Sequence, residues 1–442
     1  MIDEKKIKKE IFDKIREFYR LKFQDKKFIP KKSKVHYAGK VFDENELISM
    51  TDAILNCWFT VGKFAREFEN NFSKYIGLEN TIITNSGSSA NLLAVSCLLS
   101  SQLKSQLKKG DEVITPAMTF PTTFNPIIQN GLLPVLLDVE LNTFNMRTDI
   151  LEDALTKKTK LIIIPHSLGN CSDIKRIVDF ANEHDLYVIE DTCDALGSEY
   201  DGKLLGTFGD ISTFSFYPAH HMTMGEGGAI CTNNFDLSTI IRSIRDWGRA
   251  CACPVCKVNL DPDYVCPLLY QIEKTTTIPN DYDRKYTYLN IGYNLKPTEM
   301  QAAMGIEQLK KLSIFNKKRE KNFKILYKEF IRYQDYFILP LFLKKSKPSW
   351  FCFPLTIDTN KFKRKDFIKW FVKHNIEIKL PFAGNIIRQP AYQDIEYRVI
   401  GNLNNSDRIM KNSFFIGIYP GLDSERINYM LEVIDEFMKK HT

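Results

Sequence analysis

The sequence lacks a long hydrophobic run and an apolar N-terminal segment. Its first residues, Met1-Ile-Asp-Glu-Lys-Lys, are charged, which excludes the apolar stretch of a secretion signal there. The longest apolar run, Leu92–Leu99, is interrupted by Ser96 and is far too short to span a bilayer. We therefore expect a cytoplasmic protein with no membrane partner.

Motifs for binding nucleic acids and dinucleotides are also missing. The formal net charge is +7, but Lys and Arg are interleaved with Asp and Glu and form no stripe with aromatic residues. We expect no nucleic-acid partner. The chain has no Gly-x-Gly-x-x-Gly strand-turn-helix fingerprint, so we do not expect it to carry a dinucleotide-binding reductase of its own.

The length of 442 residues is typical of two domains, and we see no internal repeat. Ile7, Ile11, Ile15 and Phe18 recur at helical spacing, which predicts an N-terminal helical arm over residues 1–35. We expect a large domain over residues 36–305 and a smaller C-terminal domain over residues 306–442.

Strand-like apolar runs alternate with helical segments in the first half of the chain. They cover Leu133–Asp138, Leu161–His166 and Leu186–Asp191. This alternation predicts an α/β fold with a mostly parallel sheet covered by helices, in which ligands bind at the carboxyl ends of the strands. Asp191 is placed at such an end.

Two polar segments are candidates for a binding site. Gly87 and Ser88 follow a short strand and begin a helix, where amides and hydroxyls can bind a phosphate; an ordinary helix cap is the alternative. The second segment is Ser215-Phe-Tyr-Pro-Ala-His220-His221-Met-Thr-Met-Gly225-Glu226-Gly-Gly228. His220 can move a proton at neutral pH, because the pKa of an unperturbed imidazole is about 6.5.

The ten cysteines do not suggest a disulfide framework, because no secretion signal accompanies them. Cys251, Cys253 and Cys256 lie within six residues, and Cys266 follows. Thiols at this density suit a metal, and the spacing alone leaves structural zinc and iron–sulfur open.

Together these segments resemble the aspartate aminotransferase superfamily over residues 36–440, and within it the CDP-4-keto-6-deoxyglucose 3-dehydrases. The resemblance implies the pyridoxal-phosphate (PLP) dependent transferase fold type I, with a mostly parallel sheet in the large domain and a smaller α+β C-terminal domain. Sugar aminotransferases have a cofactor-binding lysine where this chain has His220, and these dehydrases have a histidine there. The resemblance therefore implies noncovalent pyridoxamine 5′-phosphate (PMP) and His220 as the catalytic base.

The same resemblance assigns the cofactor-binding residues. Asp191 matches the aspartate that faces the pyridine nitrogen, Phe120 matches the ring that stacks on the cofactor, and Asn294 matches a residue contributed across a homodimer interface. Gly87, Ser88 and Ser215 complete the implied cofactor site. Asp194 stands where aminotransferases usually have Gln near the cofactor phenol oxygen, and its role is open.

A 2Fe-2S cluster is also implied by the resemblance, within a loop over about residues 246–285. Cys193, Cys251 and Cys253 match the spacing of the family's first three ligands. We choose Cys266 as the fourth ligand and keep Cys256 as the alternative.

The function that follows from the resemblance is C3 dehydration of CDP-4-keto-6-deoxyglucose in 3,6-dideoxysugar biosynthesis for lipopolysaccharide. The cluster would relay electrons from a separate NAD(P)H-dependent flavin or iron–sulfur reductase. Three alternatives are a cluster-free, glutamate-dependent GDP-sugar 3-dehydrase, a nucleotide-sugar aminotransferase, and an inactive relative with structural zinc.

Overall fold

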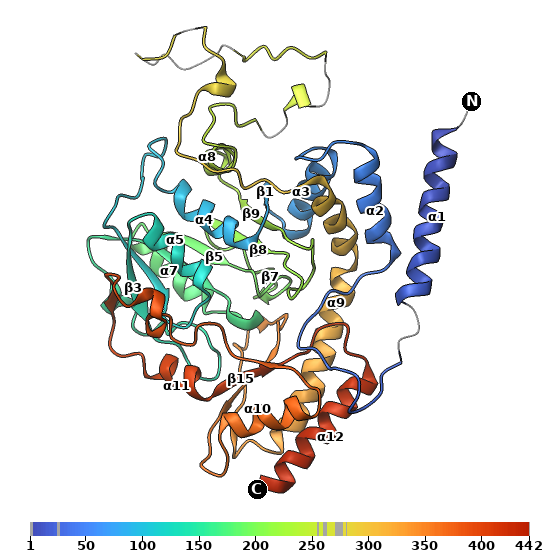
Figure 1. The fold of residues 1–442 in the computed structure, drawn as a ribbon. Helices are drawn as coiled ribbons and strands as arrows, with labels where there is room; N and C mark the ends of the chain where they lie inside the picture. Colours follow the sequence, from blue (N-terminus) through green and yellow to red (C-terminus); the bar gives the residue numbers. More distant parts are fainter. Residues whose placement is uncertain are drawn as a thin grey trace.

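An eight-stranded sheet forms the centre of the computed structural model, which describes residues 3–23, 27–253, 256–259, 263–269, 277–279 and 281–441 (Figure 1). The strand order is β1-β9-β8-β5-β4-β2-β3-β14. Five of the seven neighbouring pairs are parallel, and only β9 pairs antiparallel with β1 and β8. The strands are β1 (Asn80–Thr84), β2 (Glu112–Pro116), β3 (Leu133–Leu137), β4 (Thr159–Pro165), β5 (Tyr187–Asp191), β8 (Ile211–Ser215), β9 (Gly228–Thr232) and β14 (Arg398–Val399).

Helices cover both faces of this sheet, which explains the continuous apolar runs of its strands. Successive residues of β4 point to opposite faces, so Leu161 packs in one core and Ile162 in another. The first core is completed by α4 (Gly87–Cys97), α5 (Pro121–Gln129) and α8 (Phe235–Arg245). The opposite face is covered by α6 (Leu151–Ala154), α7 (Ile174–Glu183) and α3 (Lys63–Ile76). The predicted α/β fold with a mostly parallel sheet is confirmed.

A 33-residue helix, α9 (Glu299–Ile331), runs from the large sheet to a smaller antiparallel sheet (Figure 1). That sheet has the order β10-β12-β15-β13. Its strands are β10 (Phe337–Ile338), β12 (Phe353–Ile357), β13 (Ile378–Lys379) and β15 (Ser413–Ile416), and its helices are α10 (Arg364–Lys373), α11 (Asn404–Asn412) and α12 (Ser424–His441). A third small sheet joins β6 (Glu199–Tyr200), β7 (Lys203–Leu204) and β11 (Ser346–Lys347).

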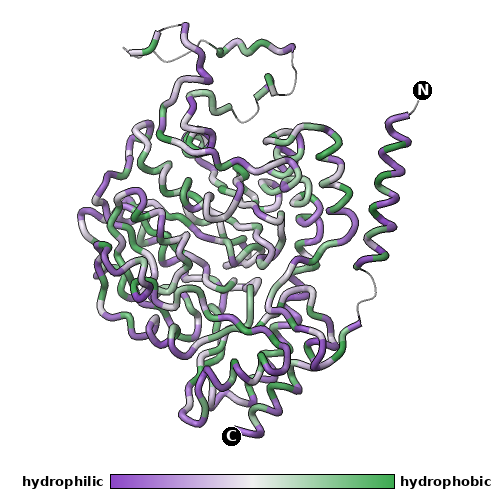
Figure 2. The backbone as a smooth tube through the Cα atoms, in the orientation of Figure 1, coloured by the Kyte–Doolittle hydropathy of each residue, from purple (hydrophilic) through white to green (hydrophobic). Residues whose placement is uncertain are grey.

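The N-terminal helix α1 (Glu4–Phe23) lies beside α2 (Glu44–Leu55) and has no buried residue. Lys8 forms an ion pair with Asp52, and the Tyr19 hydroxyl donates to the Phe42 carbonyl over 2.9 Å. Figure 2 shows that hydrophilic residues predominate along this helix, which stands at the edge of the molecule.

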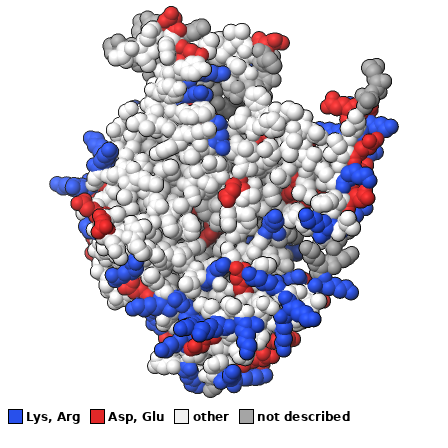
Figure 3. Space-filling view, in the orientation of Figure 1, with Lys and Arg blue, Asp and Glu red and all other residues white. Residues whose placement is uncertain are grey.

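Charge is unevenly distributed over the surface. In the face drawn in Figure 3, Lys and Arg gather over the lower part of the molecule, where Figure 1 places α10 and α12. Within the described ranges, no helix is long and apolar enough to cross a membrane.

Candidate active site

A cavity of about 430 Å³ opens where β5 and β8 end and α4 begins. This is the edge at which an open α/β sheet binds ligands. Eight of the predicted site residues line it: Gly87, Ser88, Phe120, Asp191, Cys193, Asp194, Ser215 and His220.

Asp191 is fixed by hydrogen bonds at the end of β5, where it is only 6% exposed. Its Oδ2 atom accepts from Asn91 Nδ2 at 2.8 Å and from Thr123 Oγ1 at 2.6 Å. Its Oδ1 atom accepts from the Cys193 amide at 3.2 Å. These bonds orient an anionic carboxylate at the cavity wall, where it can face a protonated ring nitrogen. Sequence reasoning missed Asn91 and Thr123, because their roles depend on contacts between separate elements.

Gly87 and Ser88 form the first turn of α4, with Ser86 as its cap. The Ser86 hydroxyl oxygen accepts from the Ser89 amide at 3.1 Å, and the earlier amides of the turn have no partner within the helix. A Cβ atom on Gly87 would lie 2.4 Å from Ser215 Cβ, so a larger residue would clash there. The amides and the Ser215 hydroxyl suit a phosphate group, and together with Asp191 they fit PLP or PMP.

His220 projects into the same cavity from the segment between β8 and β9, with 16% of its side chain exposed. Its Nδ1 atom lies 3.4 Å from Asp194 Oδ1, and within the described chain it makes no aligned hydrogen bond. Its carbonyl accepts from Arg319 Nη2 at 3.0 Å, which ties this backbone to α9. The arrangement leaves Nε2 available for proton transfer.

The neighbouring His221 has a different environment. It is only 2% exposed, and its Nε2 atom lies 2.7 Å from the Ser349 carbonyl. Burial, together with the positive charge of Arg319, lowers the pKa of His221 well below its usual value. A neutral, buried imidazole that donates to a carbonyl serves packing, and His221 does not line the cavity.

The comparisons with known proteins agree with this geometry. The DegT/DnrJ/EryC1/StrS aminotransferase family matches residues 41–435. The chain belongs to that family. The PLP-dependent fold type I architecture predicted above is thereby confirmed.

Similar proteins within the family include sugar 3-dehydratases. The chain is 46% identical to the lipopolysaccharide biosynthesis protein RfbH of Salmonella typhimurium, over 93% of each chain. It is 41% identical to the dTDP-4-dehydro-2,6-dideoxy-D-glucose 3-dehydratase of Saccharopolyspora spinosa, over 98% of this chain and 92% of that one. The structure of E. coli GDP-4-keto-6-deoxy-D-mannose-3-dehydratase with bound hydrated PLP matches with a TM-score of 0.80 and 30% identity, covering 91% of this chain and 99% of that one. Family membership and this PLP-bound relative support the predicted cofactor.

The rest of the cavity wall comes from segments that sequence reasoning did not place there. Phe351, Phe415 and Lys379 come from the C-terminal part of the chain, and Tyr37 comes from the segment before α2. Lys379 Nζ lies 3.0 Å from Glu377 Oε1, and 45% of its side chain is exposed. Lys379 therefore lies at the rim of the cavity, paired with a carboxylate.

Asn294 does not line this cavity; it forms an isolated β-bridge with Asp246. Its predicted role in a partner subunit stays a prediction.

The predicted cluster ligands are not assembled in one place. Cys193 lines the cavity, where burial and the Asp191 carboxylate raise the pKa of its thiol well above the usual value. Burial also raises the pKa of Cys251, and the nearby thiols of Cys253, Cys256 and Cys266 raise it further. Among the residues that the structure describes, no group of three or more His, Cys, Asp or Glu is arranged to hold a metal ion. Cys193 is not among the thiols that affect Cys251.

Proposed function

We propose that this protein removes the C3 hydroxyl of a nucleotide-linked 4-keto-6-deoxyhexose, using PMP bound without a covalent link. The observation that carries the proposal is that His220 lines the cavity. By the sequence resemblance, it stands in place of the cofactor-binding lysine of sugar aminotransferases. Imidazole can take up and return a proton, but it cannot form the covalent link that a lysine amine makes with an aldehyde. The relatives named as sugar 3-dehydratases support this reaction class.

Different residues of the cavity would hold different parts of such a cofactor. The first turn of α4 and Ser215 would bind its phosphate, Asp191 would face its ring nitrogen, and Phe120 would cover its ring. The chemistry that PMP supplies when bound is an amine that can condense with the sugar ketone and a ring that can accept an electron pair.

His220 Nε2 is the atom that we assign to proton removal. Asp194 Oδ1 lies 3.4 Å from the other ring nitrogen, Nδ1. Although it is not aligned for a hydrogen bond, the negative charge of this carboxylate favours a proton on Nδ1 and leaves the Nε2 lone pair free to accept one. The proton that Nε2 has taken up can then pass to the departing C3 hydroxyl, which leaves as water.

We propose CDP-4-keto-6-deoxyglucose as the substrate, in 3,6-dideoxysugar biosynthesis. The similarity to the lipopolysaccharide biosynthesis protein RfbH supports a role in lipopolysaccharide biosynthesis. The glutamate-dependent GDP-sugar reaction is a second candidate, because the chain is 31% identical to the GDP-4-keto-6-deoxy-D-mannose 3-dehydratase of Yersinia pseudotuberculosis. We also propose a homodimer, because Asn294 resembles a residue that completes the partner's site in the family; within its own chain Asn294 does not line the cavity.

The direct test is oxygen exchange at C3. Purified protein loaded with PMP is incubated with CDP-, dTDP- and GDP-linked 4-keto-6-deoxyhexoses in water labelled with heavy oxygen. Reversible loss of the C3 hydroxyl should place the label at C3, fastest with the CDP sugar, and mass spectrometry of the isolated sugar measures it. Transfer of an amino group from glutamate to C4, with no label at C3, would contradict the proposal and favour an aminotransferase.

Replacement of the C3 hydroxyl by hydrogen needs two electrons that the sugar does not supply. We propose that a separate NAD(P)H-dependent flavin or iron–sulfur reductase provides them. The spacing of Cys193, Cys251 and Cys253 supports a 2Fe-2S cluster as the relay, with Cys266 as the chosen fourth ligand, whereas the described geometry does not assemble these four residues. We therefore assign no step of the reaction to the cluster.

Analysis of iron and acid-labile sulfide tests whether the protein holds a 2Fe-2S cluster. If the spacing identifies a cluster, protein purified without oxygen should contain iron and acid-labile sulfide in equal amounts, and Cys251→Ala should lose both. Cys57→Ala is a matched control, because Cys57 is exposed and lies outside the loop. Zinc, or no metal in the wild type, would refute the cluster. Retention of iron in Cys193→Ser but not in Cys256→Ser would place all the ligands within the loop.

A further inference from the structure

Arg319 is a buried cation on α9 that reaches the segment carrying His220. It is 1% exposed and is the largest fully buried side chain among the described residues. Its Nη1 atom donates to the Phe351 carbonyl at 2.8 Å, and its Nη2 atom donates to the His220 carbonyl at 3.0 Å. One guanidinium group thus joins the loop between β8 and β9 to the segment before β12.

The two residues that Arg319 joins lie side by side in the candidate active site. Phe351 and His220 both line the active-site cavity, and their ring centres are 5.5 Å apart. The neighbouring His221 adds a second contact to the same segment, because its Nε2 atom lies 2.7 Å from the Ser349 carbonyl. The histidine pair is therefore held to this segment by the side chains of Arg319 and His221.

The segment over residues 349–351 is itself held in place by the large domain. The Phe351 amide donates to the Leu168 carbonyl at 2.9 Å. The Ser349 amide donates to Ser198 Oγ at 2.8 Å. The hydrogen bonds from α9 therefore tie the loop between β8 and β9 to a segment whose backbone other elements already fix.

The charge of Arg319 is unfavourable in this buried place. Burial lowers the pKa of Arg319 to about 10, against the Cys352 thiol and the Asp194 carboxylate, which raise it. Within the described residues, its Nε atom has no hydrogen-bond partner. An apolar side chain of similar volume would avoid the free-energy cost of burying a charge. Such a side chain lacks the planar guanidinium, whose donors can reach two carbonyl groups at once.

We propose that Arg319 is a positioning residue for His220. By holding the backbone of residue 220 to the Phe351 segment, it keeps the imidazole at the place in the cavity from which Nε2 can move a proton. The role of His220 in this inference rests on the proposed function. A displacement of a reacting group by about 1 Å can slow a reaction by about 10²-fold, so the two hydrogen bonds of Arg319 have a large effect on the rate.

Kinetics of C3 oxygen exchange test the positioning role. Arg319→Met removes both hydrogen bonds and should lower kcat by about 10²-fold with little change in KM for the sugar, because it displaces His220 and leaves the other residues of the cavity in place. Arg319→Lys keeps the charge without the planar guanidinium and should recover part of the loss. Arg332→Met is the matched control, because Arg332 directly follows α9 and its side chain is 57% exposed.

Chemical modification of the protein without cofactor provides a measurement that does not depend on the reaction. The His220 side chain is 16% exposed, and freeing its backbone should make it more accessible. Diethyl pyrocarbonate should therefore modify His220 several-fold faster in Arg319→Met than in the wild type, as mass spectrometry of the peptides can show. His36, with 52% of its side chain exposed, should be modified at an unchanged rate in the same sample.

The two measurements separate this inference from the proposed function. If the wild type exchanges no oxygen, the proposed function fails, and the modification rate alone tests whether Arg319 holds His220 in place. The inference is overturned if Arg319→Met keeps its fold by circular dichroism and His220 is modified at the wild-type rate, or if KM rises while kcat is unchanged. If Arg319→Met unfolds, Arg319→Lys decides: faster modification of His220 supports the inference, and an unchanged rate overturns it.

Discussion

Replacing His220 with asparagine is expected to slow C3 oxygen exchange by about 10²- to 10⁴-fold, the usual contribution of a positioned general base. Asparagine is similar in size but cannot take up a proton at neutral pH. The backbone bond from Arg319 to residue 220 does not involve the side chain and should persist. Exchange is measured by mass spectrometry with saturating PMP and sugar.

The control for His220→Asn is the affinity for PMP. Asp191 and Ser215 line the cavity independently of His220, so the affinity should change little, as equilibrium dialysis can show. Asp194→Asn keeps the imidazole and should slow exchange less than His220→Asn does. If His220→Asn exchanges oxygen at a rate within a few fold of the wild type, His220 is not the base.

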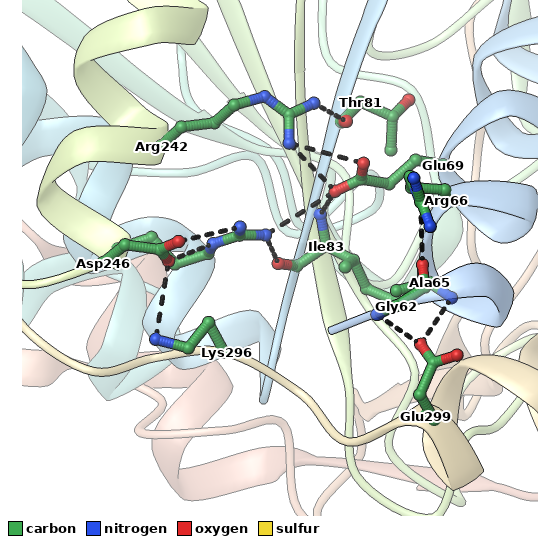
Figure 4. Close-up of polar contacts among 11 residues, drawn as sticks. Gly62, Ala65, Arg66, Glu69, Thr81, Ile83, Arg242, Asp246, Lys296 and Glu299 are labelled. Carbon is green, nitrogen blue, oxygen red and sulfur yellow. Dashed lines mark hydrogen bonds and ion pairs between the residues drawn. The ribbon is translucent and has the colours of Figure 1, made fainter. Parts of the chain in front are cut away.

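Replacing Glu69 with glutamine is expected to lower the free energy of unfolding by about 3–5 kcal/mol, the usual cost of removing one partner from a buried ion pair. The Glu69 side chain is 8% exposed and lies 3.3 Å from Arg242 Nη1 and 3.6 Å from Arg245 Nη1 (Figure 4). Without its charge, two buried guanidinium groups lose the carboxylate between them. Urea unfolding followed by circular dichroism measures the change.

An exposed ion pair provides the control for Glu69→Gln. Glu320 pairs with Lys324 one helical turn away on α9, with 72% of the lysine side chain exposed. Glu320→Gln should cost about 0.3–0.5 kcal/mol, because water and salt screen such pairs. Equal losses in the two variants would show that Glu69 contributes no more than a surface charge.

The central sheet was predictable because its strands are buried on both faces. Apolar runs over 133–138, 161–166 and 186–191 correspond to β3 (133–137), β4 (159–165) and β5 (187–191). The position of Asp191 at a strand end followed from the same pattern. The two-residue strand β14 has no periodicity from which it could be recognised, and its partner β3 is far away in the sequence.

The site residues that lie in short local motifs could be predicted from the sequence. The residues that close the cavity from distant segments could not. Gly87, Ser88, Ser215 and His220 lie in short motifs around β1, α4 and β8. Phe351, Phe415 and Lys379 reach the cavity only because the small sheet packs against the large one. The cluster ligands are harder to predict. Cys193 and Cys251 are 58 positions apart in the sequence (251 − 193), and this separation does not determine the distance between them in the structure.

The pairing of β14 with β3 has a consequence for how the chain folds. Arg398 lies beside Val135 in parallel register, so one edge of the large sheet is completed by residues near the end of the chain. During synthesis, the β3 edge remains open until almost the whole protein has left the ribosome. Pairings between distant segments are slow to form, and an unpaired edge is a site of aggregation. Chains truncated before residue 398 should therefore aggregate more readily than the full-length protein.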